Sequence, residues 1–395
     1  MPREIDISLI STLTSLETTE RMMKEFETLF GMHVQIQKQT WGSAWAELVH
    51  YSIYKNAPDI SEVGSTWIGD LIGMNTLRPF SNAEITSFGG SQAFFPSAWK
   101  SGVGEDGQVW SIPWLIDSRL LYYRKDMLEK AGIDPATAFQ THEALVDTLQ
   151  RLTQAGVELP WATPTHKTRM SLHNVASWVW GAGGQFVSED GRRSLFTTPA
   201  ALAGIKQYFE LGRFLSPQAS ELDDIESDAL FWKGQVAVTL SGPWLLSNPS
   251  TDPQIIANSG VTFPPGVPFI GGSSLVIWQS SPRARDAIAL LRFLTSQQVQ
   301  STYLSSVGLL PARQEVFSSL SSSSNPVARF ISQGLKAGRS FPLFPLWGLV
   351  EERLSSALGL IWQQLLSDPK IDLAELIERD LGLLARRLDL ALNGR

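Results

Sequence analysis

The most constraining feature of the sequence is the regular alternation of strand-like and helix-like segments near its start. The segments are a strand over 5–10, a helix over 18–30, a strand at 34–36, a helix over 43–54 and a strand over 58–63. Consecutive strands that are separated by helices pair in parallel, because the helix carries the chain back along one face of the sheet. The sequence therefore predicts a parallel sheet with helices on its faces.

The same alternation continues along the chain. Further strands are predicted at 108–112, 120–123, 236–240 and 275–278. Further helices are predicted at 126–131, 141–155, 199–214, 285–304, 346–366 and 373–392. The serine-rich segments Ser318-Ser319 and Ser321–Ser324 predict a loop. We therefore expect an α/β fold throughout.

Length and composition agree with two lobes. A chain of 395 residues with 43% hydrophobic and 18% charged residues has enough apolar material for a core in each lobe. The absence of cysteine excludes disulfides, thiolate metal sites and a cysteine nucleophile. With 32 Lys and Arg against 39 Asp and Glu, the formal charge is -7, which argues against a nucleic-acid partner.

Two features bear on the compartment. No segment approaches the roughly 18 continuous apolar residues of a membrane helix, so we expect no direct insertion into a membrane. The first residues, Met1–Asp6, lack the apolar core of a signal peptide. An extracytoplasmic location, periplasmic or at the cell surface, is expected if a signal peptide was removed, and a cytoplasmic location otherwise.

The motifs typical of enzymes and metal sites are absent or out of context. Gly102–Gly107 has the spacing of a dinucleotide-binding loop, but it precedes a predicted strand and opens no helix, so a turn is expected. Neighbouring carboxylates such as Asp223-Asp224 point apart and make no acid–base couple. None of the five histidines forms a metal-binding pair. We therefore expect no catalytic residue, cofactor or metal.

Open parallel sheets bind ligands at the carboxyl ends of their strands, so the residues that follow each strand are candidates for a ligand site. These residues are hydroxylic, aromatic, small or acidic, as carbohydrate recognition requires. They include Thr12, Thr14, Trp41, Ser65, Thr66, Trp67, Trp114, Asp117, Trp244, Gly271 and Gly272.

The chain has 14 tryptophans, whose flat faces suit stacking on sugar rings as well as core packing. Trp244 follows a buried strand and a Ser-Gly-Pro turn, and is expected to stack on a ligand. Trp67 is expected either to stack on a ligand or to pack in the core. Of Trp178 and Trp180, one is expected to face a ligand and the other the core, and Trp180 is the candidate for the site. Asp117 is expected either to bind the ligand or to form a hydrogen bond at a cap or hinge.

Several segments together resemble a known family. Residues 57–67 (APDISEVGSTW) and 112–126 (IPWLIDSRLLYYRKD) are similar to conserved blocks of extracellular solute-binding proteins of family 1, the sugar-binding components of ABC importers. Residues 231–244 (FWKGQVAVTLSGPW), 271–274 (GGSS) and 308–313 (GLLPAR) resemble three further blocks in the family order. The resemblance covers roughly residues 5–315.

The resemblance implies a fold of the type II periplasmic-binding-protein kind. One lobe would hold residues 1–113 and 272–312, and the other residues 114–271 and 313–395. The lobes would close by hinge bending on a neutral mono- or oligosaccharide in the cleft between them, and a membrane permease would receive it. The implied site includes Trp41, Asp117, Trp244, Gly272 and Arg313. A monomer is expected.

Three alternatives stay open. The chain is a binding protein for a solute other than a sugar, or a sensor module that signals without transport. A glycoside-processing enzyme on the same fold is a third reading, and it requires two carboxylates that face each other across the bond to be cleaved.

Overall fold

The computed structural model describes residues 3–10, 16–104, 106–166, 169–215, 221–248, 250–304, 310–320, 326–368 and 370–393. The chain forms two compact units. The first comprises Met1–Asp117, Ile270–Gln333 and Ser340–Gly348, and the second Ser118–Phe269, Gly334–Arg339 and Leu349–Arg395. The first unit thus includes residues 114–117, 270–271, 313–333 and 340–348, which the sequence predicts to lie in the second lobe.

The first unit is built on a six-stranded sheet with the order β10-β4-β9-β3-β1-β2. Its strands are β1 (Arg3–Ile10), β2 (Met32–Gln39), β3 (Ile60–Gly64), β4 (Ile112–Ser118), β9 (Ile270–Ile277) and β10 (Leu310–Pro311). β1 is parallel to both β2 and β3, as the alternation of strands and helices predicts. β9 is antiparallel to β3, with Gly64 opposite Ser273. The carboxyl ends of β1, β2 and β3 therefore share one edge of the sheet with the start of β9.

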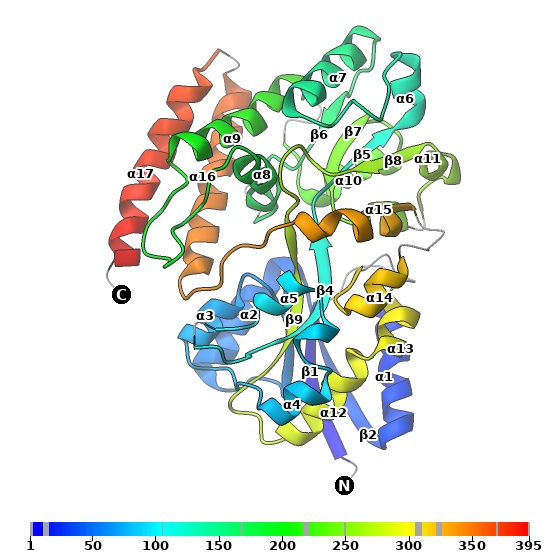
Figure 1. Cartoon of the computed structure of the whole chain (residues 1–395), viewed down its shortest axis with the longest axis vertical. Helices are drawn as coiled ribbons and strands as arrows, with labels where there is room; N and C mark the ends of the chain where they lie inside the picture. The colour runs from blue at the N-terminus through cyan, green and yellow to red at the C-terminus, as the bar shows by residue number, and fades with distance from the viewer. Residues whose placement is uncertain are drawn as a thin grey trace. The chain divides into compact units, whose positions relative to one another are not determined.

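Helices cover both faces of this sheet, with α2 and α3 on one side and α1 on the other (Figure 1). The helices are α1 (Leu16–Phe30), α2 (Trp41–Tyr54), α3 (Ile68–Gly73), α4 (Asn82–Ser87), α5 (Pro96–Lys100), α12 (Ala284–Leu294), α13 (Gln297–Val299), α14 (Gln314–Ser319) and most of α15 (Pro326–Gly334). On the side of α2 and α3, the core includes Leu48, Val63, Trp67, Leu71 and Trp278. This burial of large apolar side chains stabilises the unit.

The second unit contains a four-stranded sheet with the order β6-β7-β5-β8. Its strands are β5 (Leu120–Arg124), β6 (Trp161–Ala162), β7 (Val238–Ser241) and β8 (Ser259–Thr262). Its helices are α6 (Lys125–Lys130), α7 (His142–Gln154), α8 (Arg169–Gly181), α9 (Pro199–Glu210), α10 (Asp224–Trp232), α11 (Pro253–Ala257), α17 (Leu373–Asn393) and all but the start of α16 (Trp347–Ser367). Figure 1 shows α8, α9, α16 and α17 gathered in one part of this unit. β5 and β7 are antiparallel, with Leu120 opposite Ser241.

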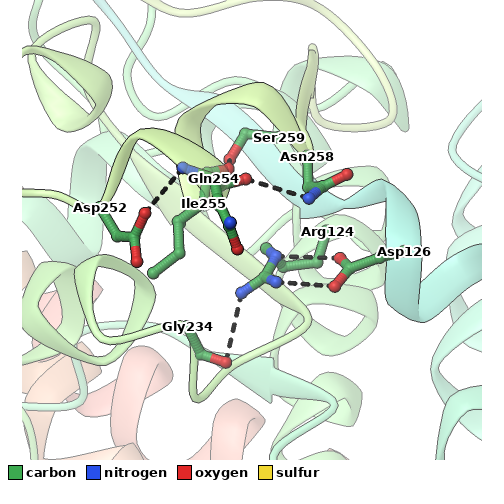
Figure 2. A network of polar contacts seen from close by, with 8 residues as sticks. All are labelled: Arg124, Asp126, Gly234, Asp252, Gln254, Ile255, Asn258 and Ser259. Carbon is green, nitrogen blue, oxygen red and sulfur yellow. Dashed lines mark hydrogen bonds and ion pairs between the residues drawn. The ribbon is translucent and has the colours of Figure 1, made fainter.

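Arg124, the last residue of β5, forms a network of polar contacts (Figure 2). Its Nε and Nη2 donate to the two carboxylate oxygens of Asp126 at 3.0 and 2.7 Å, and its Nη1 donates to the carbonyl oxygen of Gly234 at 3.3 Å. A Cβ atom at Gly234 would lie 2.6 Å from Nη1 of Arg124, and the φ angle of 67° favours glycine there. The network anchors β5 and β7 at the ends opposite Leu120 and Ser241.

Three predicted elements were wrong. The strand predicted at 108–112 begins only at Ile112, because Val109 forms isolated bridges and the continuous buried run starts after it. The helix predicted over 285–304 breaks after Leu294, where the Ser296 side chain accepts a hydrogen bond from the Val299 backbone and starts a new helix. Ser318-Ser319 end α14 instead of forming a loop. Ser321–Ser324 lie outside the described residues.

Candidate ligand-binding regions

Trp41 and Trp67 form the aromatic part of a candidate region in the first unit. Trp41 follows the N-cap residue Thr40 at the start of α2, directly after β2, and its side chain is 47% exposed. Trp67 follows β3 and is 2% exposed. The two rings meet edge to face, with centroids 5.6 Å apart, and Trp45 packs on Trp67 at 5.8 Å. Trp67 therefore supports Trp41, whose ring is the one open to a ligand.

Glycines bring the backbone close to these rings. A Cβ atom at Gly64 would lie 3.1 Å from Trp67 and 3.4 Å from Trp41. Ser65 donates its backbone N–H to the carbonyl oxygen of Gly272 at 2.9 Å. Gly272 has a φ angle of 136°, and a Cβ atom there would lie 2.0 Å from a backbone oxygen of β4. Of the predicted site residues, the structure brings together Trp41, Ser65, Trp67 and Gly272, with their chain neighbours Thr66 and Gly271.

A buried carboxylate ties two strands together next to this region. Glu62 in β3 is 3% exposed. It accepts hydrogen bonds from the backbone N–H of Ile10 at 2.9 Å and from Oγ of Ser273 at 2.5 Å. Burial raises the pKa of Glu62 to about 7, although the two hydrogen bonds oppose the shift. Glu62 thereby links the end of β1 to the start of β9.

Trp114, Asp117 and Arg313 occupy other positions in the first unit. Trp114 is buried in β4, and its carbonyl oxygen accepts a hydrogen bond from Gln300 Nε2 at 2.9 Å. Oε1 of Gln300 accepts a hydrogen bond from the backbone N–H of Arg313 at 2.9 Å. The Arg313 guanidinium lies over the ring of Phe94, 5.6 Å from its centroid, and burial lowers its pKa. Asp117 is half-buried near the end of β4.

In the second unit, Trp244 follows β7 and is held by three contacts. Its indole Nε1 donates to Oδ2 of Asp228 at 3.0 Å. Its six-membered ring lies over Gly242, where a Cβ atom would fall 2.2 Å from two ring carbons. The guanidinium carbon of Arg119 is 5.0 Å from the ring centroid. Trp244 is half-buried, so part of the fixed ring faces solvent.

Arg119, Asp224 and Asp228 bring three charges to the same place. Arg119 directly precedes β5 and is 2% exposed, whereas Asp224 and Asp228 lie one turn apart on α10. Burial raises the pKa of Asp224 to about 7 and that of Asp228 to about 6, and the positive charge of Arg119 opposes both shifts. These side chains line a small cavity together with Pro164, Asn174, Leu240, Ser241 and Trp244.

Trp180 lies elsewhere in the second unit, on α8. It is 5% exposed, stacks on Phe269 with centroids 6.3 Å apart, and has the Arg339 guanidinium 5.2 Å from its ring centroid. Its neighbour Trp178 is 1% exposed and packs on Tyr208. Neither tryptophan presents an exposed ring. Thr12 and Thr14 lie outside the described residues.

The predicted site residues do not include Arg119, Asn174, Asp224 or Asp228. The sequence pairs Asp224 with its neighbour Asp223, but the carboxylates that share a cavity, Asp224 and Asp228, are four residues apart on one helix. The i, i+4 spacing of these two aspartates, which places them on one face of a helix, was the sequence signal that could have identified them. Nothing local links Arg119 to α10. In the part of the chain that the structure describes, no three His, Cys, Asp or Glu residues are grouped to hold a metal, and no helix is long and apolar enough to cross a membrane.

The two α/β units, each with its own sheet, have the fold of type II periplasmic binding proteins. Solved structures share this fold. A solute-binding protein from Thermotoga lettingae, bound with α-D-tagatose, has a TM-score of 0.86 and 22% identity, and the match covers 99% of this chain and 100% of that one. Maltose-bound MalE3 from T. maritima has a TM-score of 0.83 and 20% identity, covering 96% and 99%.

The chain belongs to the family of bacterial extracellular solute-binding proteins, whose model matches residues 21–328. The diacetylchitobiose-binding protein DasA of Streptomyces coelicolor is 23% identical, over 84% of this chain and 77% of the relative. The sn-glycerol-3-phosphate-binding periplasmic protein UgpB of Salmonella typhimurium is 26% identical, over 65% and 61%. Because the family consists of binding proteins, the prediction of a protein that binds a solute and catalyses no reaction is confirmed.

Proposed function

We propose that this protein is the substrate-binding component of an ABC importer and that its solute is a neutral mono- or oligosaccharide. The observation that carries the proposal is Trp244, whose partly exposed ring is fixed beside Asp228 and Arg119. A sugar needs a flat apolar surface for its C–H groups and charged or polar groups for its hydroxyls. Trp41 offers a second exposed ring in the first unit.

The relatives support a carbohydrate and also favour one other candidate. Diacetylchitobiose, α-D-tagatose and maltose appear in the names of DasA and of the two solved structures. UgpB binds sn-glycerol 3-phosphate, an anionic solute, and makes that class the second candidate. The two classes differ in charge, so binding measurements separate them directly.

Delivery to a membrane permease, a location outside the cytoplasm and a monomeric state belong to the same proposal. The family description as extracellular supports the location. We infer that both units contribute contacts to the solute and that the lobes close on it. Light scattering with and without solute tests the monomer, and a solute-dependent decrease in the radius of gyration tests closure.

A thermal-shift screen followed by calorimetry tests the solute class. The probes are maltose, D-tagatose, N,N'-diacetylchitobiose and sn-glycerol 3-phosphate. We expect at least one sugar to raise the melting temperature, because a solute that binds only the folded state stabilises it. We expect Trp244→Ala to bind that sugar at least about tenfold more weakly, since the aromatic surface is lost.

The control is Tyr54→Ala, which removes an aromatic ring that is 67% exposed at the far end of α2. It should bind like the parent. If no sugar shifts the melting temperature, or if Trp244→Ala binds as tightly as the parent, the carbohydrate proposal fails. A shift with sn-glycerol 3-phosphate alone would select the second candidate.

A further inference from the structure

The cavity next to Trp244 is small and polar. Its lining includes Arg119, Asn174, Asp224, Asp228 and Ser241. The space that a water-sized sphere can occupy is about 10 Å³, which matches a single water molecule. One hydroxyl or one ammonium group therefore fits, whereas a phosphate group, with its five heavy atoms, is too large.

Several polar atoms in this lining, including those of Asn174, Asp224 and Ser241, are buried and make no hydrogen bond to a described residue. Asn174 is 1% exposed, and neither its amide oxygen nor its amide nitrogen has hydrogen-bond geometry with a described residue. Burial raises the pKa of the neighbouring Tyr208 hydroxyl to about 12, and the Asn174 amide opposes that shift. Oδ1 of Asp224 is buried and likewise makes no hydrogen bond to a described residue. Buried polar atoms are costly to leave unpaired, so the cavity favours an occupant that donates to the oxygens of Asn174 and Asp224, and a hydroxyl can also accept from Nδ2 of Asn174.

The charges in the lining point to the same kind of occupant. Two carboxylates, Asp224 and Asp228, face one guanidinium, that of Arg119, and the exposed Asp223 adds further negative potential. When both lining carboxylates are ionised, the cluster carries one excess negative charge. A neutral donor is tolerated, a cation compensates the excess, and an anion is repelled at low effective dielectric.

We propose that this cavity is a subsite that receives one hydrogen-bond-donating group of the bound carbohydrate, a hydroxyl or an ammonium, and excludes anionic groups. The subsite rests on the proposed function, because the group enters while the rest of the sugar lies against Trp244. The subsite also predicts which class of solute this chain binds. It accepts a neutral sugar, like the solute of DasA, and rejects an anion, like the solute of UgpB. The chain is then specific for neutral sugars or amino sugars and rejects their phosphorylated forms.

Calorimetry at about pH 7 with probes that differ in one charged group tests this specificity. One series is D-glucose, D-glucosamine and D-glucose 6-phosphate, and another is N,N'-diacetylchitobiose with its deacetylated, cationic form chitobiose. Maltose and sn-glycerol 3-phosphate extend the neutral and anionic sets. We expect the parent protein to bind neutral or cationic probes and to bind phosphorylated probes at least about a hundredfold more weakly, because like charges repel in a buried site.

Asp224→Asn and Asp228→Asn test the origin of the selection. Both changes keep the size of the side chain, and the amide oxygen that Asp228→Asn introduces can still accept the hydrogen bond from Trp244. We expect each to lower the affinity ratio of amino sugar to neutral sugar by about tenfold and to weaken the rejection of phosphate by a similar factor. Asp223→Asn is the matched control, because it removes an exposed charge on the same helix and keeps the N-cap of α10.

Three results are distinguishable. Shifted ratios in the two lining variants, with clearly smaller shifts in Asp223→Asn, whose exposed charge acts from outside the lining, support the subsite. A phosphorylated probe that binds the parent as tightly as its neutral form, or ratios that both lining variants leave unchanged, overturns the subsite alone. Failure of every sugar to bind the parent overturns the proposed function as well. Melting curves at about pH 8 verify folding, since each lining variant removes a buried carboxylate and should be no less stable than the parent.

Discussion

The two units hold their candidate tryptophans by different means. In the first unit, Trp41 rests against the buried Trp67 and the bare backbone of Gly64. In the second unit, Trp244 is fixed by a hydrogen bond to Asp228 and by the guanidinium of Arg119. Both arrangements place a ring against a glycine, Gly64 or Gly242, but the first holds its exposed ring by aromatic packing and the second holds it by charged side chains.

This difference predicts which kind of substitution, a change of size or a change of charge, each region tolerates least. The Trp41 region should respond most to changes of size, because the residues that hold it are uncharged aromatic rings and the glycines Gly64 and Gly272. The second unit should respond most to changes of charge, as the Asp224 and Asp228 variants test. Glu62, a buried carboxylate of the first unit, has a different role, because it accepts hydrogen bonds from the ends of two strands and contacts no aromatic ring through them.

The largest effect is expected for Gly272→Ala in the first unit. The φ angle of 136° is unfavourable for alanine, and the new methyl group would lie 2.0 Å from a backbone oxygen of β4. We expect the free energy of unfolding to fall by at least about 3 kcal/mol. Urea denaturation followed by tryptophan fluorescence measures the change.

The matched control for this change is Gly42→Ala. Gly42 lies near the start of α2, and a Cβ atom there would meet nothing nearer than Thr40 Oγ1 at 3.9 Å. Its free energy of unfolding should equal or exceed that of the parent, because alanine favours helix. If Gly272→Ala were as stable as Gly42→Ala, the claim that shape governs the Trp41 region would be wrong.

For Glu62→Gln we expect a smaller change in the free energy of unfolding, and we expect an increase instead of a decrease. Because the folded-state pKa of Glu62 is raised from 4.5 to about 7, the parent gains stability when this group is neutral and loses it as the pH rises through that interval. Between about pH 4.5 and about pH 8, that loss amounts to roughly 3 kcal/mol. Glutamine cannot ionise, so the variant should gain about that much stability relative to the parent over the same range.

Urea denaturation of both proteins at the two pH values measures this effect. Glu47→Gln serves as the control, because it removes an exposed carboxylate of α2 and should leave the pH dependence unchanged. A Glu62→Gln variant with the same pH dependence as the parent would show that burial does not govern this carboxylate.

Much of the fold was predictable because its signals are local. Alternation of apolar residues located β1, β2 and β3, and Gly31 ends α1 with a φ angle of 61°, as its position after an apolar helical face predicts. The helix predicted over 285–304 failed for an equally local reason. Its apolar spacing continues past Leu294, but the cap at Ser296 interrupts the hydrogen-bonding pattern.

The candidate regions were predictable only in part, because they depend on contacts between distant segments. Strand-end position identified Trp41 and Trp244, but it also selected Trp67, and periodicity alone does not show which of two neighbouring rings covers the other. Burial raises the pKa values of Asp224 and Asp228, and the charge that opposes both shifts is that of Arg119, which lies far from them in the sequence. Burial and charge pairing of this kind follow from the tertiary structure and leave no local pattern.

The smallest effect on stability is expected for Trp41→Ala, and it separates binding from folding in the first unit. Because the ring is 47% exposed and its main contact is one edge-to-face pair, its removal should cost about 1 kcal/mol of unfolding free energy. Affinity for the sugar identified by the thermal-shift screen should nevertheless fall by about tenfold if Trp41 contacts the solute. Tyr54→Ala, on the same helix, should change neither quantity by as much. Calorimetry and urea denaturation of both variants give the comparison. A loss of stability in Trp41→Ala without a loss of affinity would make Trp41 a packing residue and would leave Trp244 as the aromatic contact of the solute.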